Sequence, residues 1–216
     1  MIKAVIFDMY ETLVSLFTCS TYMGHDVSVD LGIDEKKFRE IWNATEDDRS
    51  IGKITFEEVI ERIMRVNNIY SEELFKTIIY KRKTIPAEAF NNMHSEIIPM
   101  MEKLKENGKK IALISNCFFE ERENIMQSKL WKYFDCKCLS CELGIKKPDI
   151  KIYEHCLNQL SVKPEECLYV GDGGSNELET AELADFDEML YKVEGSGENG
   201  EGDSYLIATA EQPIST

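Results

Sequence analysis

Short runs of consecutive apolar residues mark the places where this chain predicts buried strands. The first covers residues 4–7 and is followed at once by Asp8. Comparable runs occupy residues 111–115 and 167–171, while residues 136–140 and 188–192 are further candidate strands and residues 204–208 a short final one. Strands without polar alternation are typical of a parallel sheet that is covered on both faces. Because helical segments lie between these runs, the pattern predicts a doubly wound α/β fold.

The stretch from residue 18 to residue 94 has helical spacing instead. Thr55 and Glu58 match a capping box, in which two side chains satisfy free backbone amides at a helix start. The apolar residues that accompany it recur every three or four positions, at Phe56, Val59, Ile60, Ile63 and Met64. Asp34 and Ser71 are suitable N-caps for two more helices. These residues together predict a small helical bundle.

Beyond this stretch, helices alternate with the predicted strands. They cover about 99–107, 120–129, 148–160 and 175–184. The sequence thus predicts an α/β core domain of residues 1–17 and 95–216, with a helical domain of residues 18–94 inserted after the first strand. Residues 194–203 alternate glycine with acidic or polar residues, which predicts a mobile surface loop. The role of that loop is left open.

The charge balance narrows the kinds of partner. The formal net charge is −15 at pH 7 and no extended basic patch is visible, so binding to nucleic-acid phosphates or anionic lipid surfaces is disfavoured. No charged and apolar leader precedes the first strand, and no apolar run approaches the roughly 20 residues that span a bilayer. We therefore expect a soluble, cytoplasmic protein with a small-molecule substrate and no nucleic-acid or membrane partner. Its oligomeric state is left open.

Seven cysteines in a chain without an export signal predict free thiols. Cys136, Cys138 and Cys141 are close enough in sequence to suggest a thiolate metal site. They lack a second Cys/His pair at finger-like spacing, and two of them alternate as along a strand. Buried strand residues are the favoured interpretation.

Polar residues follow several of the predicted strands. Asp8 comes directly after the first, Ser115 and Asn116 end the second, Lys147 precedes the helix that leads to the fourth, and Asp172 follows the fourth. Each has a simple structural explanation as a cap, turn or solvated residue. Because parallel strands direct their carboxyl ends to one edge, where α/β sheets bind ligands, we expect these side chains to share a crevice.

Four motifs make a family resemblance specific. They are residues 7–13 (FDMYETL), 114–116 (ISN), 144–149 (GIKKPD) and 170–172 (VGD). Their order and spacing resemble the haloacid dehalogenase superfamily of aspartate-nucleophile hydrolases over essentially the whole chain. The helical insertion also stands where that family carries a small helical cap. The resemblance implies a Rossmann-like core whose active site is closed by the cap.

The resemblance implies a catalytic role for each matched residue. Asp8 would be the nucleophile, attacking a phosphoryl group to form an aspartyl intermediate, which divides hydrolysis into two easier steps. Attack on an anion needs compensating positive charge, which Lys147 would supply. Ser115 and Asn116 would belong to the second catalytic motif, with Ser115 and nearby amides binding the transferring group.

The resemblance also implies a magnesium ion as cofactor. Asp8, the backbone carbonyl of Tyr10 and Asp172 would be its protein ligands, and Glu177 would act through a metal-bound water. Oxygen ligands of this kind suit a hard divalent cation.

Tyr10 departs from the phosphatase pattern, in which a second aspartate two residues after the nucleophile is the general acid and base. A tyrosine there resembles the metal-independent 2-haloacid dehalogenases. Those enzymes lack the Gly-Asp of the fourth motif, whereas this chain keeps Gly171 and Asp172. A magnesium-dependent phosphatase acting on a small phosphorylated metabolite is therefore favoured. A dehalogenase-type hydrolase and a catalytically degenerate binding protein are the alternatives.

Substrate choice in such a fold would depend on the helical insertion. Tyr22, His25 and Arg49 are polar or cationic residues of that segment and are the candidate substrate contacts. Each is equally interpretable as an ordinary surface or packing residue.

Overall fold

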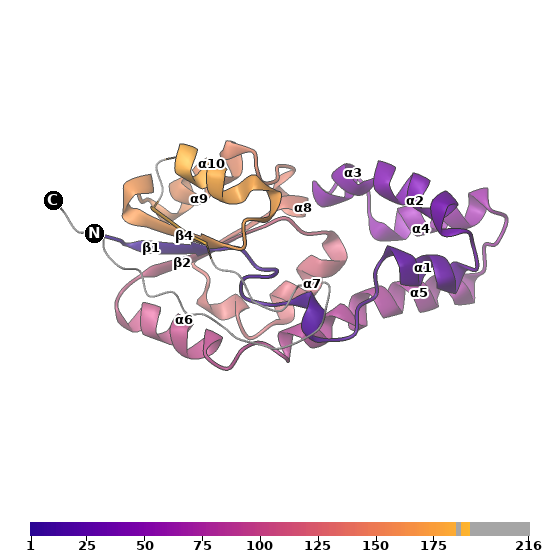
Figure 1. Cartoon of the computed structure of the whole chain (residues 1–216), viewed down its shortest axis with the longest axis horizontal. Coiled ribbons are helices and arrows are strands. Elements are labelled where there is room, and N and C mark those ends of the chain that lie inside the picture. Colours follow the sequence, from indigo (N-terminus) through magenta and orange to yellow (C-terminus); the bar gives the residue numbers. More distant parts are fainter. Residues whose placement is uncertain (185–186, 191–216) are drawn as a thin grey trace.

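The computed structural model describes residues 1–184 and 187–190. Its centre is a parallel five-stranded sheet in the order β3-β2-β1-β4-β5. The strands are β1 (Ala4–Phe7), β2 (Lys110–Ser115), β3 (Cys136–Leu139), β4 (Cys167–Gly171) and β5 (Asp187–Leu190). The doubly wound α/β prediction is confirmed, and helices cover both faces of the sheet (Figure 1). The predicted loop at 194–203 and strand at 204–208 lie outside the described residues.

The strands are apolar on both sides because each side faces a different layer of helices. Alternate residues of β1 divide between two clusters: Val5 and Phe7 pack on one face, Ala4 and Ile6 on the other. All four are at most 5% exposed. Burying a side chain of the size of Val5 or Ile6 stabilises the fold by roughly 1.5–3 kcal/mol. β1 is the middle strand of the sheet, so side chains on both of its faces contribute in this way.

The core helices follow the predicted alternation. They are α6 (Ile97–Glu106), α7 (Phe119–Gln127), α8 (Ser140–Leu143), α9 (Ile150–Leu160) and α10 (Glu177–Leu183). The helices α9 and α10 pack on β2, β3, β4 and β5 from one side, and α6 packs on β2 from the other (Figure 1). Short 3₁₀ helices occupy Leu16–Thr18, Pro86–Phe90, Trp131–Tyr133, Pro164–Glu166 and Gly174–Asn176.

The helical insertion, defined here as α1 to α5, extends from one end of the sheet (Figure 1). It contains α1 (Gly24–Leu31), α2 (Glu35–Ala44), α3 (Glu46–Ser50), α4 (Phe56–Val66) and α5 (Glu72–Thr84). These helices enclose a hydrophobic cluster of their own. Asp34, Thr55 and Ser71 cap α2, α4 and α5, and Thr55 forms the predicted capping box with Glu58. The division of the chain into two domains at the predicted boundaries stays a prediction.

One helix begins later than the spacing suggested. The sequence predicted a helix from residue 175, but Ser175 and Asn176 have φ angles of 57° and 50°. This left-handed conformation is incompatible with a continuous right-handed helix, so α10 starts at Glu177. The turn that results places Glu177 directly beneath the end of β4, with its carboxylate accepting from the Gly173 amide at 3.3 Å.

The described helices include none that is long and apolar enough to span a membrane.

Candidate active site

Asp8 lies where β1 ends between two parallel neighbours. Its backbone amide donates to Val170 O at 2.9 Å, which fixes the start of the following turn against β4. The register pairs Phe7 with Leu113 on one side and with Val170 on the other. Ser115 and Asp172 each follow those partners by two residues, so all three polar residues reach the same edge of the sheet. The expected convergence at this edge is therefore present.

Lys147 reaches this edge from the loop before α9 and is buried. Its ammonium lies 2.7 Å from Asp8 Oδ1 and also pairs with Glu177. Asn116 holds the lysine backbone from two sides: the Asn116 amide donates to Lys147 O at 2.9 Å, and Lys147 N donates to Asn116 Oδ1 at 2.8 Å. Asn116 therefore positions Lys147 beside Asp8.

The buried charges at this site do not balance. Three carboxylates, those of Asp8, Asp172 and Glu177, have ligand oxygens within 4.8 Å of one another, and Lys147 is the ammonium paired with two of them. Burial raises the pKa of both Asp8 and Glu177, while Lys147 opposes that shift. Burial alone would lower the pKa of Lys147, but the two carboxylates raise it. The cluster thus carries an excess of negative charge.

The three carboxylates fit a hard divalent cation. Such an ion takes oxygen ligands, and it would offset the two negative charges that Lys147 leaves uncompensated. Asp172 is only partly buried, so the cluster is open to solvent on its side. The Gly174 amide donates to Asp172 Oδ1 at 2.9 Å and orients the carboxylate. The donor set is therefore suited to magnesium, with Asp8, Asp172 and Glu177 as the side chains that would hold it or its water.

Within the part of the chain that the structure describes, two buried hydroxyls close to this edge have no hydrogen-bond partner. Ser115 Oγ, at the end of β2, and Thr12 Oγ1, four residues after Asp8, are both inaccessible to solvent and unpaired. A buried polar group without a partner costs about 1–3 kcal/mol. Unpaired hydroxyls beside a predicted nucleophile are the arrangement that an anionic ligand would satisfy.

Tyr10 follows Asp8 by two residues but its ring turns toward the helical layer. It packs edge-on against Phe90, with ring centroids 6.3 Å apart. Burial raises the pKa of Tyr10 well above its usual value, and the carboxylate of Glu121 adds to the shift. The phenol therefore stays protonated throughout the neutral range, when it can donate a hydrogen bond but cannot act as a base.

A buried ion-pair network joins the helical insertion to the core near Tyr10. Arg82, from α5, donates to Glu120 at 3.1 Å and to Glu121 at 2.8 Å, both in the first turn of α7. A third donor nitrogen of Arg82 reaches the backbone oxygen of Tyr22 at 3.1 Å. The Arg82 and Glu120 side chains are 4% and 2% exposed. This network fixes α5 against the helix that follows β2.

The three candidate substrate contacts have different surroundings. Tyr22 is buried and its hydroxyl donates to Asp30 at 2.6 Å. His25 is exposed and pairs with Glu35 at 2.9 Å. Arg49 is 1% exposed, and its guanidinium lies between the rings of Trp42 and Phe118 at 3.9 and 4.6 Å from their centroids.

Arg49 has buried donors that are unused. One of its nitrogens donates to the Trp42 backbone at 3.2 Å, but Nε and Nη1 have no hydrogen-bond partner among residues 1–184 and 187–190. Phe118 stands two residues after Asn116, so this guanidinium lies along the segment that leads away from β2. The roles of Tyr22, His25 and Arg49 in substrate binding stay predictions.

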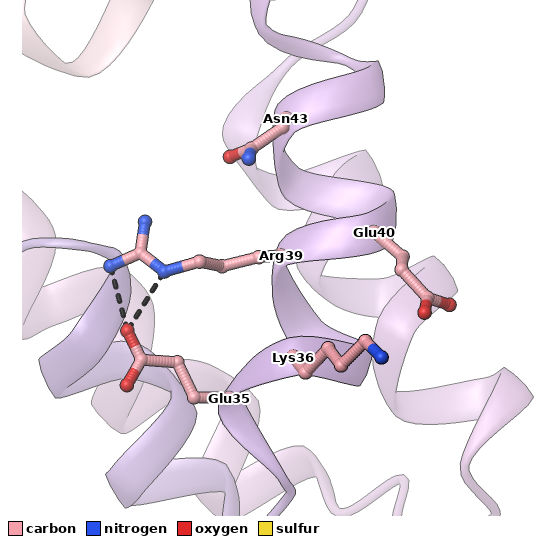
Figure 2. Close-up of a pocket in the computed structure, with 5 residues that line it drawn as sticks. All are labelled: Glu35, Lys36, Arg39, Glu40 and Asn43. Atoms are coloured by element: carbon pink, nitrogen blue, oxygen red, sulfur yellow. Dashed lines mark hydrogen bonds and ion pairs between the residues drawn. The ribbon is translucent and has the colours of Figure 1, made fainter.

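Arg39, another arginine of the helical insertion, lies in a different environment from Arg49. It lines an open depression on α2 together with Glu35, Lys36, Glu40 and Asn43 (Figure 2). Its guanidinium pairs with Glu35 at 2.7 Å. This ion pair engages the Arg39 guanidinium on the outer side of α2. Arg49 is therefore the better candidate for a substrate contact.

Several polar residues of this region were missed by the sequence interpretation. Tyr169 donates to Glu177 at 2.9 Å, and Tyr153 donates to the backbone oxygen of Glu177 at 3.0 Å. Arg82 was also missed: a basic residue in the last turn of a helix is ordinarily solvated, so the sequence carries no signal for its burial. Thr12 lies inside the first motif, which was the available signal for it.

Comparison with known proteins agrees with this geometry. A family model described as haloacid dehalogenase-like hydrolase matches residues 2–185. The chain belongs to this family. It is therefore a hydrolase, and the resemblance drawn from the four motifs is confirmed.

Curated relatives of this hydrolase include glyceraldehyde 3-phosphate phosphatases. The protein of Methanopyrus kandleri is 31% identical over 97 residues, which cover 44% of this chain and 42% of that protein. The Methanocaldococcus jannaschii protein is 24% identical over 84% of this chain and 81% of its own length. Phosphoserine phosphatase of Thermus thermophilus is 27% identical over 53% of this chain and 44% of that protein. This hydrolase thus spans less than half the length of two of these three relatives.

Solved structures share the fold. A haloacid dehalogenase family enzyme from Bacteroides thetaiotaomicron superposes with a TM-score of 0.71 at 16% identity, covering 90% of this chain and 96% of that one. The same enzyme in complex with magnesium and inorganic phosphate gives a TM-score of 0.68 at 18% identity, covering 92% and 97%. These likenesses establish a common architecture.

Proposed function

We propose that this hydrolase is a magnesium-dependent phosphatase that cleaves a small phosphorylated metabolite through an aspartyl-phosphate intermediate on Asp8. The observation that carries the proposal is the buried pair of Asp8 and Lys147 within an acidic cluster that still needs positive charge. Phosphatase names among the relatives, and the magnesium and phosphate bound by a structural neighbour, support the same reaction class.

The protein groups would divide the reaction into two steps. In the first, an oxygen of Asp8 attacks phosphorus while the bond to the leaving oxygen breaks. In the second, water attacks the phosphoryl group and releases Asp8. Lys147 would attract the transferring group and limit its repulsion by Asp8, while Ser115 and Thr12 would donate their unused hydroxyls to its oxygens. Such fixed donors act mainly by stabilising charge that develops in the transition state.

Bound magnesium would offset the negative charge shared by the carboxylates and the phosphoryl oxygens. Asp8, Asp172 and the backbone carbonyl of Tyr10 are the proposed ligands, with Glu177 acting through water. Because Glu177 already pairs with Lys147, we propose that it also keeps the lysine oriented when a substrate phosphate competes for it.

Arg49 is the proposed contact for the part of the substrate beyond the phosphate. A buried guanidinium with two unused donor nitrogens can bind a hydrogen-bond acceptor, and its planar shape suits a carboxylate or another anionic oxygen group. Burial lowers the pKa of Arg49, and the nearby carboxylate of Glu120 opposes that shift. Tyr22 and His25 are weaker candidates for this contact, since each already has an acidic partner.

Hydrolysis of an aryl phosphate by purified protein tests the proposal directly. We expect magnesium-dependent turnover that disappears with a chelator and returns with magnesium, and no turnover in Asp8→Asn. Asp34→Asn is the matched control, because Asn remains a good N-cap for α2 and lies outside the site. Retained activity in Asp8→Asn would exclude the covalent mechanism. Chelator-resistant halide release from a 2-haloacid would favour the dehalogenase alternative, and no turnover of either substrate would favour a binding protein.

A further inference from the structure

Three cysteine sulfurs meet on the face of the sheet covered by α9, away from the catalytic motifs. Cys136 and Cys138 alternate along β3 and so face the same side, while Cys156 comes from the middle of α9. The three Sγ atoms lie within 4.8 Å of one another, and those of Cys136 and Cys138 are 3.6 Å apart. We name Cys136, Cys138 and Cys156 the thiol triad. It differs from the sequence cluster, since Cys141 lies elsewhere and Cys156 takes its place.

The sulfur spacing matches that of a metal centre. Metal–thiolate bonds are about 2.3 Å long, so three sulfurs around one ion lie about 4 Å apart. The sulfurs of the triad lie within 4.8 Å of one another, with one pair at 3.6 Å, so their separations are close to this spacing. By contrast, the second cysteine contact, between Cys117 and Cys141 at 3.8 Å, offers two sulfurs rather than three. The triad is thus the sulfur set with enough ligands for a stable centre.

We propose that the thiol triad binds a soft metal ion of low coordination number, and that this ion is monovalent copper. Thiolate ligands select soft ions such as Cu(I) over hard ones. Within the described residues, the ligand set contains the three sulfurs and no fourth histidine or carboxylate at comparable distance. Zinc in structural sites requires four ligands, whereas a soft monovalent ion is satisfied by three sulfurs. The site is independent of the phosphatase proposal, since its residues are outside the four motifs.

The surroundings of the triad favour loading by such an ion. Binding would replace the thiol protons, which pass to solvent water, with bonds from sulfur to the ion. Cys136 is 8% exposed on an edge strand, which gives the ion access, while Cys138 and Cys156 are fully buried.

Anaerobic titration with Cu(I), buffered by a chromophoric Cu(I) chelator, tests the proposal on the whole protein. We expect one tightly held equivalent, thiolate-to-copper charge-transfer absorption in the ultraviolet, release of protons, and a copper-edge absorption spectrum with three sulfur neighbours. No binding in competition with the chelator, or a spectrum with oxygen and nitrogen neighbours, would overturn it. So would tighter binding of Zn²⁺ than of Cu(I), because it would exclude the low-coordinate preference.

Variants locate the bound ion. Cys136→Ser changes the least buried member of the triad, and we expect it to weaken Cu(I) binding at least tenfold. Cys167→Ser is the matched control: Cys167 lies in the same apolar layer but its thiol donates to Lys163 O at 3.3 Å, outside the triad. Cys117→Ser removes the competing pair and should leave binding unchanged. If Cys117→Ser abolishes binding, or if Cys136→Ser leaves it unchanged, the ion is not held by the triad. The copper-edge spectrum of the native protein tests the proposal by itself, so the test remains valid even if a variant folds poorly.

Discussion

Two buried polar centres lie on either side of the β2–α7 connection. One has too little positive charge, and the other has too few hydrogen-bond acceptors. At the sheet edge, the ammonium of Lys147 faces the carboxylates of Asp8 and Glu177, with Asp172 close by. That centre has too little positive charge. In the junction between the helical insertion and α7, Arg82 is fully engaged by two glutamates.

The junction also holds Arg49, which is buried and leaves two donors unused. That centre has too few acceptors. Because buried polar groups are normally paired, the proposed magnesium ion would offset the deficit at the sheet edge, and the proposed anionic group of the substrate would offset the deficit near Arg49. A phosphorylated molecule bound with magnesium and carrying a second acidic group would satisfy both, and the variants below test each deficit separately.

The largest effect is expected from Lys147→Met. Removing the ammonium leaves the carboxylates without their fixed counter-charge, so turnover of an aryl phosphate should fall on the order of 10³-fold. The neighbouring Lys146→Met is the matched control, because Lys146 pairs with the exposed Asp47 at the surface. Steady-state kcat at saturating magnesium is the measurement. A loss below about tenfold would show that magnesium alone supplies the positive charge at this site.

Arg82→Met should reduce stability rather than chemistry. It would leave the buried carboxylates of Glu120 and Glu121 without their ion-pair partner, which costs about 3–5 kcal/mol. The urea midpoint would fall accordingly, with little change in the midpoint for Arg65→Met, whose pair with Glu61 is exposed. A small effect of Arg82→Met would mean that water replaces the arginine, and that α5 and α7 are held mainly by apolar packing.

Arg49→Lys tests the acceptor deficit. A lysine keeps the charge but loses the planar fork, and the two are not interchangeable at bidentate sites. For a phosphate ester that carries a carboxylate, KM should rise by about tenfold, which corresponds to about 1.4 kcal/mol, with kcat nearly unchanged. Arg39→Lys is the control, since Arg39 is committed to Glu35 on the outer side of α2 (Figure 2).

The same comparison should be run with a plain aryl phosphate. If KM rises equally for the two substrates in Arg49→Lys, the arginine supports the fold and does not recognise an anion.

The sequence was informative about the sheet edge because its residues are tied to strand ends. Asp8 and Asp172 follow continuous apolar strands, and parallel strands bring their ends together whatever the helices do. The pairing of Lys147 with Glu177 was not predictable, since it depends on a turn in which Ser175 and Asn176 take left-handed conformations. Neither residue type demands that conformation in advance.

The junction between the helical insertion and α7 could hardly be predicted from the sequence. Arg82 and Arg49 occupy helices rich in charge, where the pattern favours solvated faces. Tertiary contacts bury them: Arg82 pairs with α7, and Arg49 lies between Trp42 and Phe118. The thiol triad has the same origin: Cys156 joins Cys136 and Cys138 because α9 covers β3. Contacts between elements far apart in the chain are set by tertiary packing, which local periodicity does not encode.

Tyr10 connects the two centres, and Tyr10→Asp is expected to give the smallest effect. A fully positioned general acid contributes about 10²–10⁴-fold, but a new carboxylate here would lie near Glu121, whose own pKa is raised by burial. We therefore expect a gain of at most about tenfold, larger for alkyl phosphates than for aryl phosphates, because only a poor leaving group needs the proton.

The measurement for Tyr10→Asp is the ratio of kcat/KM between the two kinds of ester across neutral pH. In the native protein the phenol stays protonated over this range, since its pKa is raised well above the usual value, so no titration of Tyr10 should appear. Tyr10→Phe is the control: it removes the hydroxyl and keeps the packing against Phe90. Equal gains for both esters in Tyr10→Asp would mean that the new carboxylate acts on the water or the metal and not on the leaving group, and the sheet edge would then function without help from the junction.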